Sequence, residues 1–176
     1  ARAEEVRAAS ITAVHLPRGG MPALGDNPLF LGCADYRSTI ASNAESSGFT
    51  FPEEMRRHAD KGTALVTDKD PGDAEIAEVV SQAAAHSCIV LGTYNGHILQ
   101  GQLRLAKALA ATGLPMILVA LRNPYDLRNM PDHVAALAGW EYTIPMPLFD
   151  ALWPVLNGTV RPTGKLPLLT LTKAAE

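Results

Sequence analysis

Apolar runs and amphipathic segments alternate along most of the chain. A run of six apolar residues extends from Met116 to Leu121 and ends at Arg122, Asn123 and Pro124. An apolar run of this length with turn residues behind it predicts a strand that is buried on both faces. Shorter apolar runs predict further strands at residues 11–16, 30–34, 64–67, 88–91 and 140–144.

Helical periodicity occupies the segments between these runs. The clearest apolar stripe has the spacing i, i+3, i+4, i+7 and consists of Ile76, Val79, Val80 and Ala83. Asp70, followed by Pro71, predicts the N-cap of that helix, and Thr50 with Glu53 has capping-box spacing. Other helices are predicted at residues 4–9, 36–47, 98–111, 133–138 and 149–156. In the helix at 98–111, the expected core residues are Leu99, Leu103, Ala106 and Ala110.

This alternation predicts an α/β fold in a single domain. Near-continuous apolar strands separated by helices are typical of a mostly parallel sheet with helices on both faces, which is a three-layer α/β/α sandwich of flavodoxin-like type. We expect residues 1–28 to be an N-terminal linker helix and loop, and residues 29–176 to be the sandwich domain. The polar, helix-prone opening ARAEEVRAAS suggests a helix that continues from upstream, and therefore a longer protein.

The composition and net charge of the chain argue against some classes of binding partner. The chain has 176 residues, 47% of them hydrophobic and 19% charged, which is typical of a globular domain. The net charge is −3 and the Lys and Arg residues are scattered, which argues against nucleic acid or an anionic membrane as a partner. No run approaches the ~20 apolar residues of a membrane span. Cys33 and Cys88 both lie in apolar runs and are expected to be buried thiols.

Motifs for cofactors and metals are missing from the expected places. Residues 32–36 lack the glycines of a dinucleotide-binding fingerprint, and Leu166 follows Gly164-Lys165 where a P-loop needs Ser or Thr. There is no Gly-x-Ser-x-Gly, and neither Cys has metal-ligand spacing. We therefore expect no cofactor and no metal, while a flavin site without a motif stays open. His97 follows a predicted strand and is expected to be a polar residue lining its loop.

Polar side chains gather beyond the C-terminal end of the strand at 116–121, which is where open α/β sheets meet ligands or partner surfaces. Asp126 is expected to accept hydrogen bonds within its turn. The alternative is hydrolysis by a pair of carboxylates, for which the chain offers Asp35, Asp68, Asp126 and Glu141 near predicted strand ends. Nothing in the sequence spacing requires any two of these acids to meet.

Four motifs together resemble a known family. They are Gly92-Thr93-Tyr94-Asn95, the run from Ala120 to Leu127, Trp140-Glu141-Tyr142-Thr143, and Pro162-Thr163-Gly164-Lys165-Leu166-Pro167. In this order they resemble the C-terminal domain of family 3 glycoside hydrolases, in the bacterial β-N-acetylglucosaminidase branch. Residues 8–12 are similar to the segment that leaves the preceding barrel domain. The resemblance spans nearly the whole chain, although Pro154 inside the last predicted helix departs from the family pattern.

The resemblance implies a partner domain and a sugar substrate. In that branch an N-terminal TIM barrel holds an N-acetylglucosaminide and supplies the catalytic acids, so no catalytic residue is assigned to this chain and the isolated chain is expected to be inactive. Residues expected to contact substrate or the domain interface are Asn95, Arg122, Asn123, Tyr125 and Asp126. Bracing an interface is favoured over direct sugar contact. The alternative function is a stand-alone module that binds a sugar or small ligand without catalysis.

Overall fold

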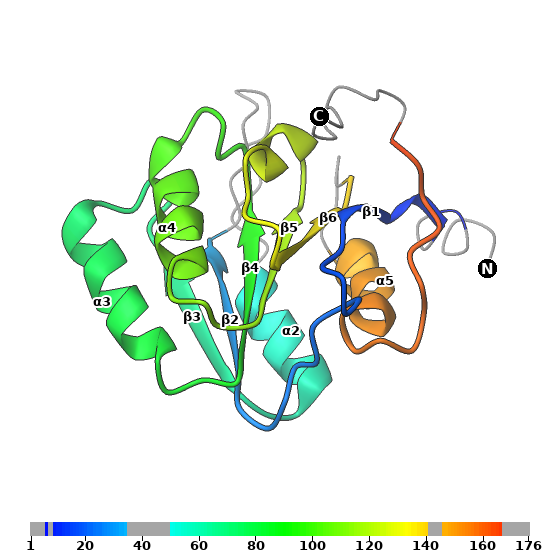
Figure 1. Cartoon of the computed structure of the whole chain (residues 1–176), viewed down its shortest axis with the longest axis horizontal. Coiled ribbons are helices and arrows are strands. Elements are labelled where there is room, and N and C mark those ends of the chain that lie inside the picture. Colours follow the sequence, from blue (N-terminus) through cyan, green and yellow to red (C-terminus); the bar gives the residue numbers. More distant parts are fainter. Residues whose placement is uncertain (1–5, 7–8, 35–49, 141–145, 167–176) are drawn as a thin grey trace.

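In a computed structural model, the described residues are 6, 9–34, 50–140 and 146–166. They form a six-stranded sheet with helices on both faces (Figure 1). The strands are β1 (Thr12–His15), β2 (Pro28–Cys33), β3 (Thr63–Thr67), β4 (Cys88–Thr93), β5 (Met116–Ala120) and β6 (Val134–Ala138). The helices are α2 (Phe51–Ala59), α3 (Asp73–Ala83), α4 (Gln100–Ala110), α5 (Met146–Leu156) and the 3-10 helix η1 (Pro124–Leu127).

The sheet order is β1-β6-β5-β4-β2-β3, and every neighbouring pair is parallel except β1 with β6. Because successive side chains of a strand point to opposite faces, each central strand supplies both layers of core. In β4, Ile89 and Leu91 pack with α3 and α4 on one face. Val90 packs on the other face, with α2 and α5. The three-layer α/β/α sandwich predicted from the sequence is therefore confirmed.

Local signals account for the elements that the sequence located correctly. All five residues of β5 are buried, as the apolar run predicted. Thr50 caps α2: its Oγ1 accepts a hydrogen bond from the backbone N–H of Glu53 at 3.4 Å and donates one to Glu53 Oε2 at 2.6 Å. Cys33 and Cys88 are both buried and do not form a disulfide.

One element after β5 was predicted wrongly, and so was the first residue of another. The segment at 133–138, expected to be a helix, contains strand β6, which is fully buried between β1 and β5. Its sequence, VAALA, is a short apolar run rich in alanine, so local propensity favoured a helix and tertiary packing overrode it. Trp140, expected to begin a strand, lies outside β6 with a φ of 62°. The rest of that predicted strand, and the predicted helix at 36–47, lie outside the described residues.

The core face of α4 is displaced from the predicted stripe. Its buried leucines are Leu105 and Leu109, whereas Leu103 is only half-buried. The helix begins at Gln100, two residues later than predicted, with Leu99 in the N-cap position. Ala106 and Ala110 are buried as expected.

The predicted linker at residues 1–28 contains a strand of the sheet. β1 pairs with β6, and the pairing register shifts between Ala13 and His15. The C-terminal segment also reaches this edge, because the backbone N–H of Gly164 donates a hydrogen bond to the carbonyl of Ile11 at 3.0 Å. Residues 12–15 are therefore tied to the sandwich, and the domain boundary at residue 28 stays a prediction.

Asp70 caps a different helix from the one predicted. Helix α3 begins at Asp73 with Gly72 in the N-cap position, and no side chain caps it. Asp70 Oδ1 instead accepts a hydrogen bond, 2.5 Å long, from the backbone N–H of Gly101 in the first turn of α4. A helix N-terminus leaves backbone N–H groups unpaired, so a carboxylate from a neighbouring loop satisfies one of them.

Replacing Asp70 with alanine is therefore expected to lower the free energy of unfolding by about 1 kcal/mol, as for the loss of a helix cap. Asp68→Ala is the matched control, because both carboxylates are on the same exposed loop and no helix N–H group is paired with Asp68 Oδ atoms in the described structure. Urea denaturation of both variants measures the difference. Equal losses for the two variants would contradict the capping role.

Candidate functional site: the strand-end loops

Strands β4 and β5 end side by side, so the loops that follow them both lie at the C-terminal ends of the parallel strands. Thr93 is in register with Ala120, and the backbone N–H of Leu121 donates to the carbonyl of Thr93 at 3.0 Å. The loop at residues 94–99 and the loop at residues 121–128 therefore leave the sheet as neighbours. We call these two loops the strand-end rim.

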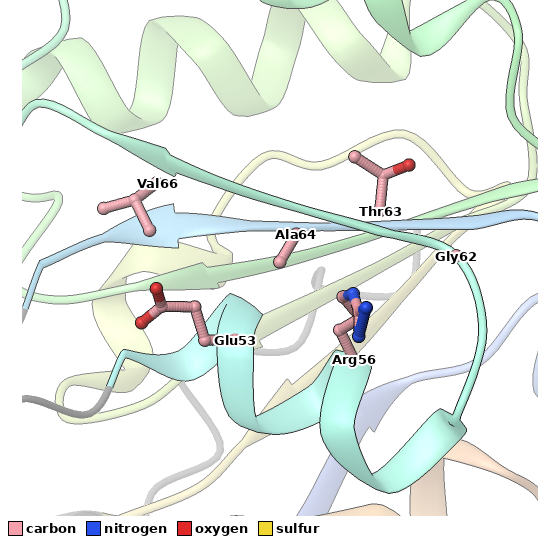
Figure 2. Close-up of a pocket in the computed structure, with 6 residues that line it drawn as sticks. All are labelled: Glu53, Arg56, Gly62, Thr63, Ala64 and Val66. Atoms are coloured by element: carbon pink, nitrogen blue, oxygen red, sulfur yellow. The ribbon is translucent and has the colours of Figure 1, made fainter.

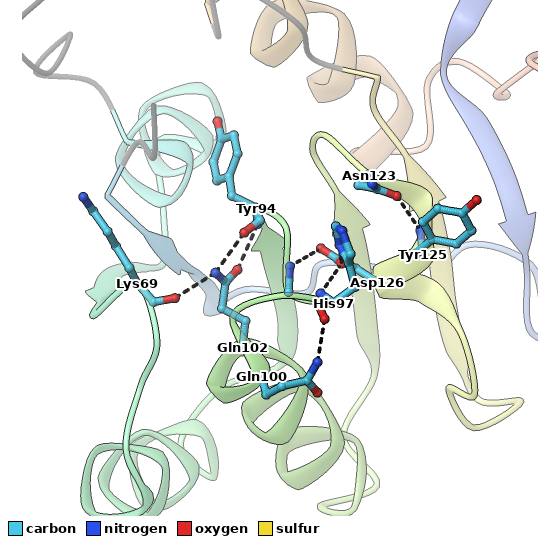
Figure 3. A network of polar contacts seen from close by, with 9 residues as sticks. Lys69, Tyr94, His97, Gln100, Gln102, Asn123, Tyr125 and Asp126 are labelled. Atoms are coloured by element: carbon cyan, nitrogen blue, oxygen red, sulfur yellow. Dashed lines mark hydrogen bonds and ion pairs between the residues drawn. The ribbon is translucent and has the colours of Figure 1, made fainter. Parts of the chain in front are cut away.

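Asp126 joins the two loops of the rim (Figure 3). Its carboxylate is fully buried and accepts hydrogen bonds from the backbone N–H groups of Gly96 and His97, each 2.8 Å long. The Nδ1 atom of His97 lies 3.2 Å from the same carboxylate. Asp126 therefore accepts hydrogen bonds, but the prediction that the donors lie within its own turn is wrong, because they belong to the neighbouring loop.

Asn95 and Asn123 shape the backbone of the rim. Asn95 is 9% exposed and has a φ of 54°, a left-handed conformation that asparagine adopts more readily than most residues. Its carbonyl accepts hydrogen bonds from the N–H groups of Ile98 and Leu99. Asn123 Oδ1 accepts a hydrogen bond from the N–H of Tyr125 at 3.1 Å and so caps η1. Both residues therefore hold loop conformations that local chemistry favours.

Tyr125 is the aromatic residue of the rim. Its side chain is 41% exposed, and its ring meets the ring of His97 edge-on, with centroids 6.0 Å apart. The guanidinium carbon of Arg128 lies 4.6 Å from the Tyr125 ring centroid, which is a cation–π geometry. Arg122 is half-buried at the start of the same loop. The rim thus presents an aromatic ring and cationic groups on a braced backbone.

Gln102 is a structural residue of the site that the sequence did not reveal. It is buried in α4, and its amide nitrogen donates to the carbonyls of Lys69 and Tyr94 at 2.8 and 3.0 Å (Figure 3). Its amide oxygen accepts from the N–H of Tyr94 at 2.9 Å. A polar residue on the core side of a helix was the available signal, but the predicted stripe assigned the core to other positions.

The geometry does not support hydrolysis by Asp126. Its two oxygens already bind two backbone N–H groups and a histidine ring, and the side chain has no contact with solvent. A nucleophile or general acid must instead reach the substrate at hydrogen-bonding distance. Asp68 is exposed on another loop, while Asp35 and Glu141 lie outside the described residues. The described acids therefore do not form a catalytic pair around Asp126.

The described part of the chain has no metal site of the usual kind. It contains no group of three His, Cys, Asp or Glu residues placed to hold a metal ion. Burial raises the pKa of the Cys88 thiol to about 12, so the free thiol is protonated at neutral pH. None of the described helices has the length and apolar character to cross a bilayer. Two open hollows on the described surface lie away from the rim, one along β3 and one beside α5.

Comparison with solved structures identifies the fold family. The chain is similar to a glycoside hydrolase family 3 β-N-acetylglucosaminidase from Paenibacillus sp. str. FPU-7, with 26% sequence identity over 96% of this chain and a TM-score of 0.76. It is also similar in fold to a fungal multi-domain family 3 β-N-acetylglucosaminidase (17% identity, 98% of this chain, TM-score 0.72). A β-glucosidase from Listeria innocua matches at 17% identity over 94% of this chain, with a TM-score of 0.68. No family model and no curated protein matches the chain.

The match covers only part of each relative. The chain spans 32% of the Paenibacillus enzyme, 19% of the fungal enzyme and 26% of the Listeria enzyme. A sandwich that occupies a third or less of these chains corresponds to one domain among several. Together with the four motifs and the observed three-layer sheet, these matches are consistent with a C-terminal α/β domain of the glycoside hydrolase family 3 type that lacks the catalytic barrel.

Proposed function

We propose that this chain acts as the C-terminal domain of a larger β-N-acetylglucosaminidase and packs its strand-end rim against a catalytic TIM barrel. The observation that carries this proposal is the 26% identity over 96% of the chain to the Paenibacillus β-N-acetylglucosaminidase. The parent enzyme would remove terminal N-acetylglucosamine by a retaining mechanism, with both carboxyl groups supplied by the barrel.

The rim has the character of a docking surface. Asp126 links its two loops through buried hydrogen bonds, so the exposed groups are presented on a fixed backbone. Tyr125 is 41% exposed and Ile98 is 69% exposed, and both are large enough to bury substantial apolar area in an interface. Arg122 could bind a carboxylate or backbone carbonyls of the barrel through its planar guanidinium. In this arrangement Asn95, Asn123 and Asp126 shape the rim, while Arg122 and Tyr125 contact the partner domain.

A direct sugar contact by Tyr125 has less support. Aromatic faces stack on sugars, but Arg128 already lies 4.6 Å from the centroid of this ring. The edge of the ring meets His97. A rim that braces the interface around the substrate cleft fits these contacts better than a stacking platform does.

The chain alone is expected to show no turnover of a chromogenic N-acetylglucosaminide above the uncatalysed rate, because Asp126 cannot reach a substrate. A longer protein that contains an upstream barrel is expected to hydrolyse the same compound. Turnover by the 176-residue chain that disappears in Asp126→Asn or Glu141→Gln would contradict the proposal and support a catalytic site within this domain. Saturable binding of N-acetylglucosamine by the chain alone, measured by calorimetry, would instead favour the stand-alone module.

The same two proteins test the position of the rim. Tyr125→Ala should lower the unfolding temperature of the longer protein, where the ring is covered, and leave that of the chain nearly unchanged, where the ring is exposed. Val160→Ala is the control, because this exposed residue lies outside the rim. An equal effect of Tyr125→Ala in both proteins would show that the rim does not face the barrel.

A further inference from the structure

The two edges of the sheet differ in how they are protected. The β1 edge has a register irregularity and a backbone hydrogen bond from Gly164 to Ile11, both of which hinder the addition of another strand. The β3 edge has a regular register with β2 over all five of its residues. Its sequence, TALVT, contains no charge and no proline, which are the usual devices that protect an edge strand.

The β3 edge is also open to solvent in the described structure. Among the described strands, β3 pairs with β2 alone. Val66 is 40% exposed on this strand, and an open hollow of about 530 Å³ runs between β3 and α2. Figure 2 shows Glu53 and Arg56 of α2 projecting toward this hollow below the strand. An open apolar edge with two opposite charges beside it has the features of an interface.

We propose that β3 pairs antiparallel with β3 of a second copy of this chain, so that two sheets join into one across a two-fold axis at Leu65. A two-fold axis perpendicular to the sheet requires each residue to oppose one whose side chain lies on the same face. Centring the axis on Leu65 meets this condition and places Ala64 opposite Val66 of the second copy. Leu65 packs with the α3 face, so Ala64 and Val66 lie on the α2 face.

The α2 helices then meet across the same axis. α2 packs against both β2 and β3, and therefore lies over the space between them. With neighbouring strands ~4.8 Å apart, the two α2 axes would be about 10 Å apart, which is a normal helix packing distance. The joined edge would therefore bury side chains of α2 as well as the strand, with Val66 and Ala64 on either side of the axis.

Charge complementarity selects this second copy as the partner. α2 runs antiparallel to β3, so Glu53 lies near Val66 and Arg56 lies near Gly62 at the start of the strand (Figure 2). The two-fold operation that brings Val66 next to Ala64 of the second copy also brings Glu53 toward Arg56 of that copy, and the reverse. Each copy thus supplies one acidic and one basic residue, and the dimer contains two equivalent ion pairs between Glu53 of one copy and Arg56 of the other. An interface between identical copies requires this self-complementarity.

Sedimentation velocity over a concentration series from about 1 to about 500 µM tests the proposal in the range of weak to moderate association. The chain is expected to pass from monomer to dimer, with no larger species, because the two-fold pairing is closed. Val66→Lys places a charge on the paired edge and should raise the dissociation constant at least about tenfold. Val160→Lys is the matched control: it is also an exposed valine, lies outside β3 and α2, and should leave the constant unchanged.

Charge reversal tests the register. Arg56→Glu should weaken the dimer and Glu53→Lys/Arg56→Glu should restore it, because the double change exchanges the two charges. Thermal melting of each variant is recorded alongside, since Glu53 also takes part in the cap of α2. Three results would overturn the proposal: a monomer at every concentration, a dimer unaffected by Val66→Lys, or continued growth beyond the dimer. Failure of the double variant to restore a properly folded dimer would overturn the proposed register.

Discussion

Asp126→Ala is expected to lower the free energy of unfolding by about 3 kcal/mol, because it leaves two backbone N–H groups without their carboxylate partner in the interior. The carboxylate is 0% exposed and accepts 2.8 Å hydrogen bonds from Gly96 and His97. The loss should therefore exceed that of an ordinary surface carboxylate several-fold.

Urea denaturation of the variant and of the unmodified chain measures this difference. Asp126→Asn keeps the shape and one accepting oxygen, so its loss should be intermediate. Asn123→Ala is the control within the same loop, since it removes one hydrogen bond to the Tyr125 N–H and should cost about 1 kcal/mol. A loss below that of Asn123→Ala would show that Asp126 does not hold the two loops together.

Phe51→Ala is expected to cost about 4 kcal/mol, as for other large aromatic side chains removed from a packed core. The Phe51 ring is 1% exposed and meets Phe149 of α5 edge-on at a centroid distance of 5.7 Å. It also lies directly over Gly92 in β4, where a Cβ added to the glycine would come within 2.5 Å of Phe51 Cδ1. The ring therefore fills the space that the glycine leaves between the sheet and α2.

A double-mutant cycle checks this explanation. Gly92→Ala alone should destabilise the chain, because its methyl group would displace the Phe51 ring or α2. In the Phe51→Ala background the same methyl group enters the vacated space, so the combined loss should be smaller than the sum of the two single losses. Additive losses, measured by thermal or urea denaturation, would show that the two positions do not compete for one volume.

Signals confined to a few neighbouring residues predicted much of the fold. The apolar run of β5 and the capping box of Thr50 with Glu53 depend on residues within one element, so the sequence alone was enough to predict them. β6 escaped prediction because its alanine-rich run is compatible with either a helix or a strand. This segment is a strand because it pairs with β1 and β5, and the local sequence pattern does not indicate that pairing.

The candidate site depends on partners that are distant in sequence. The apolar pattern correctly predicted that Asn123 and Asp126 follow strand β5, in a loop at the C-terminal ends of the parallel strands. The contacts of Asp126 with the loop after β4, and of Asp70 with α4, join residues about thirty positions apart. Such pairings arise from strand order, which hydrophobic periodicity does not determine.

The hydrogen bond between Gly164 and Ile11 has a mechanical consequence. It places the start of the first strand and the segment after the last described helix at one corner of the sheet. A force that pulled residues 11 and 164 apart would load this local contact first, and the parallel strands at the centre only later. The sandwich would thus yield stepwise, starting from this corner.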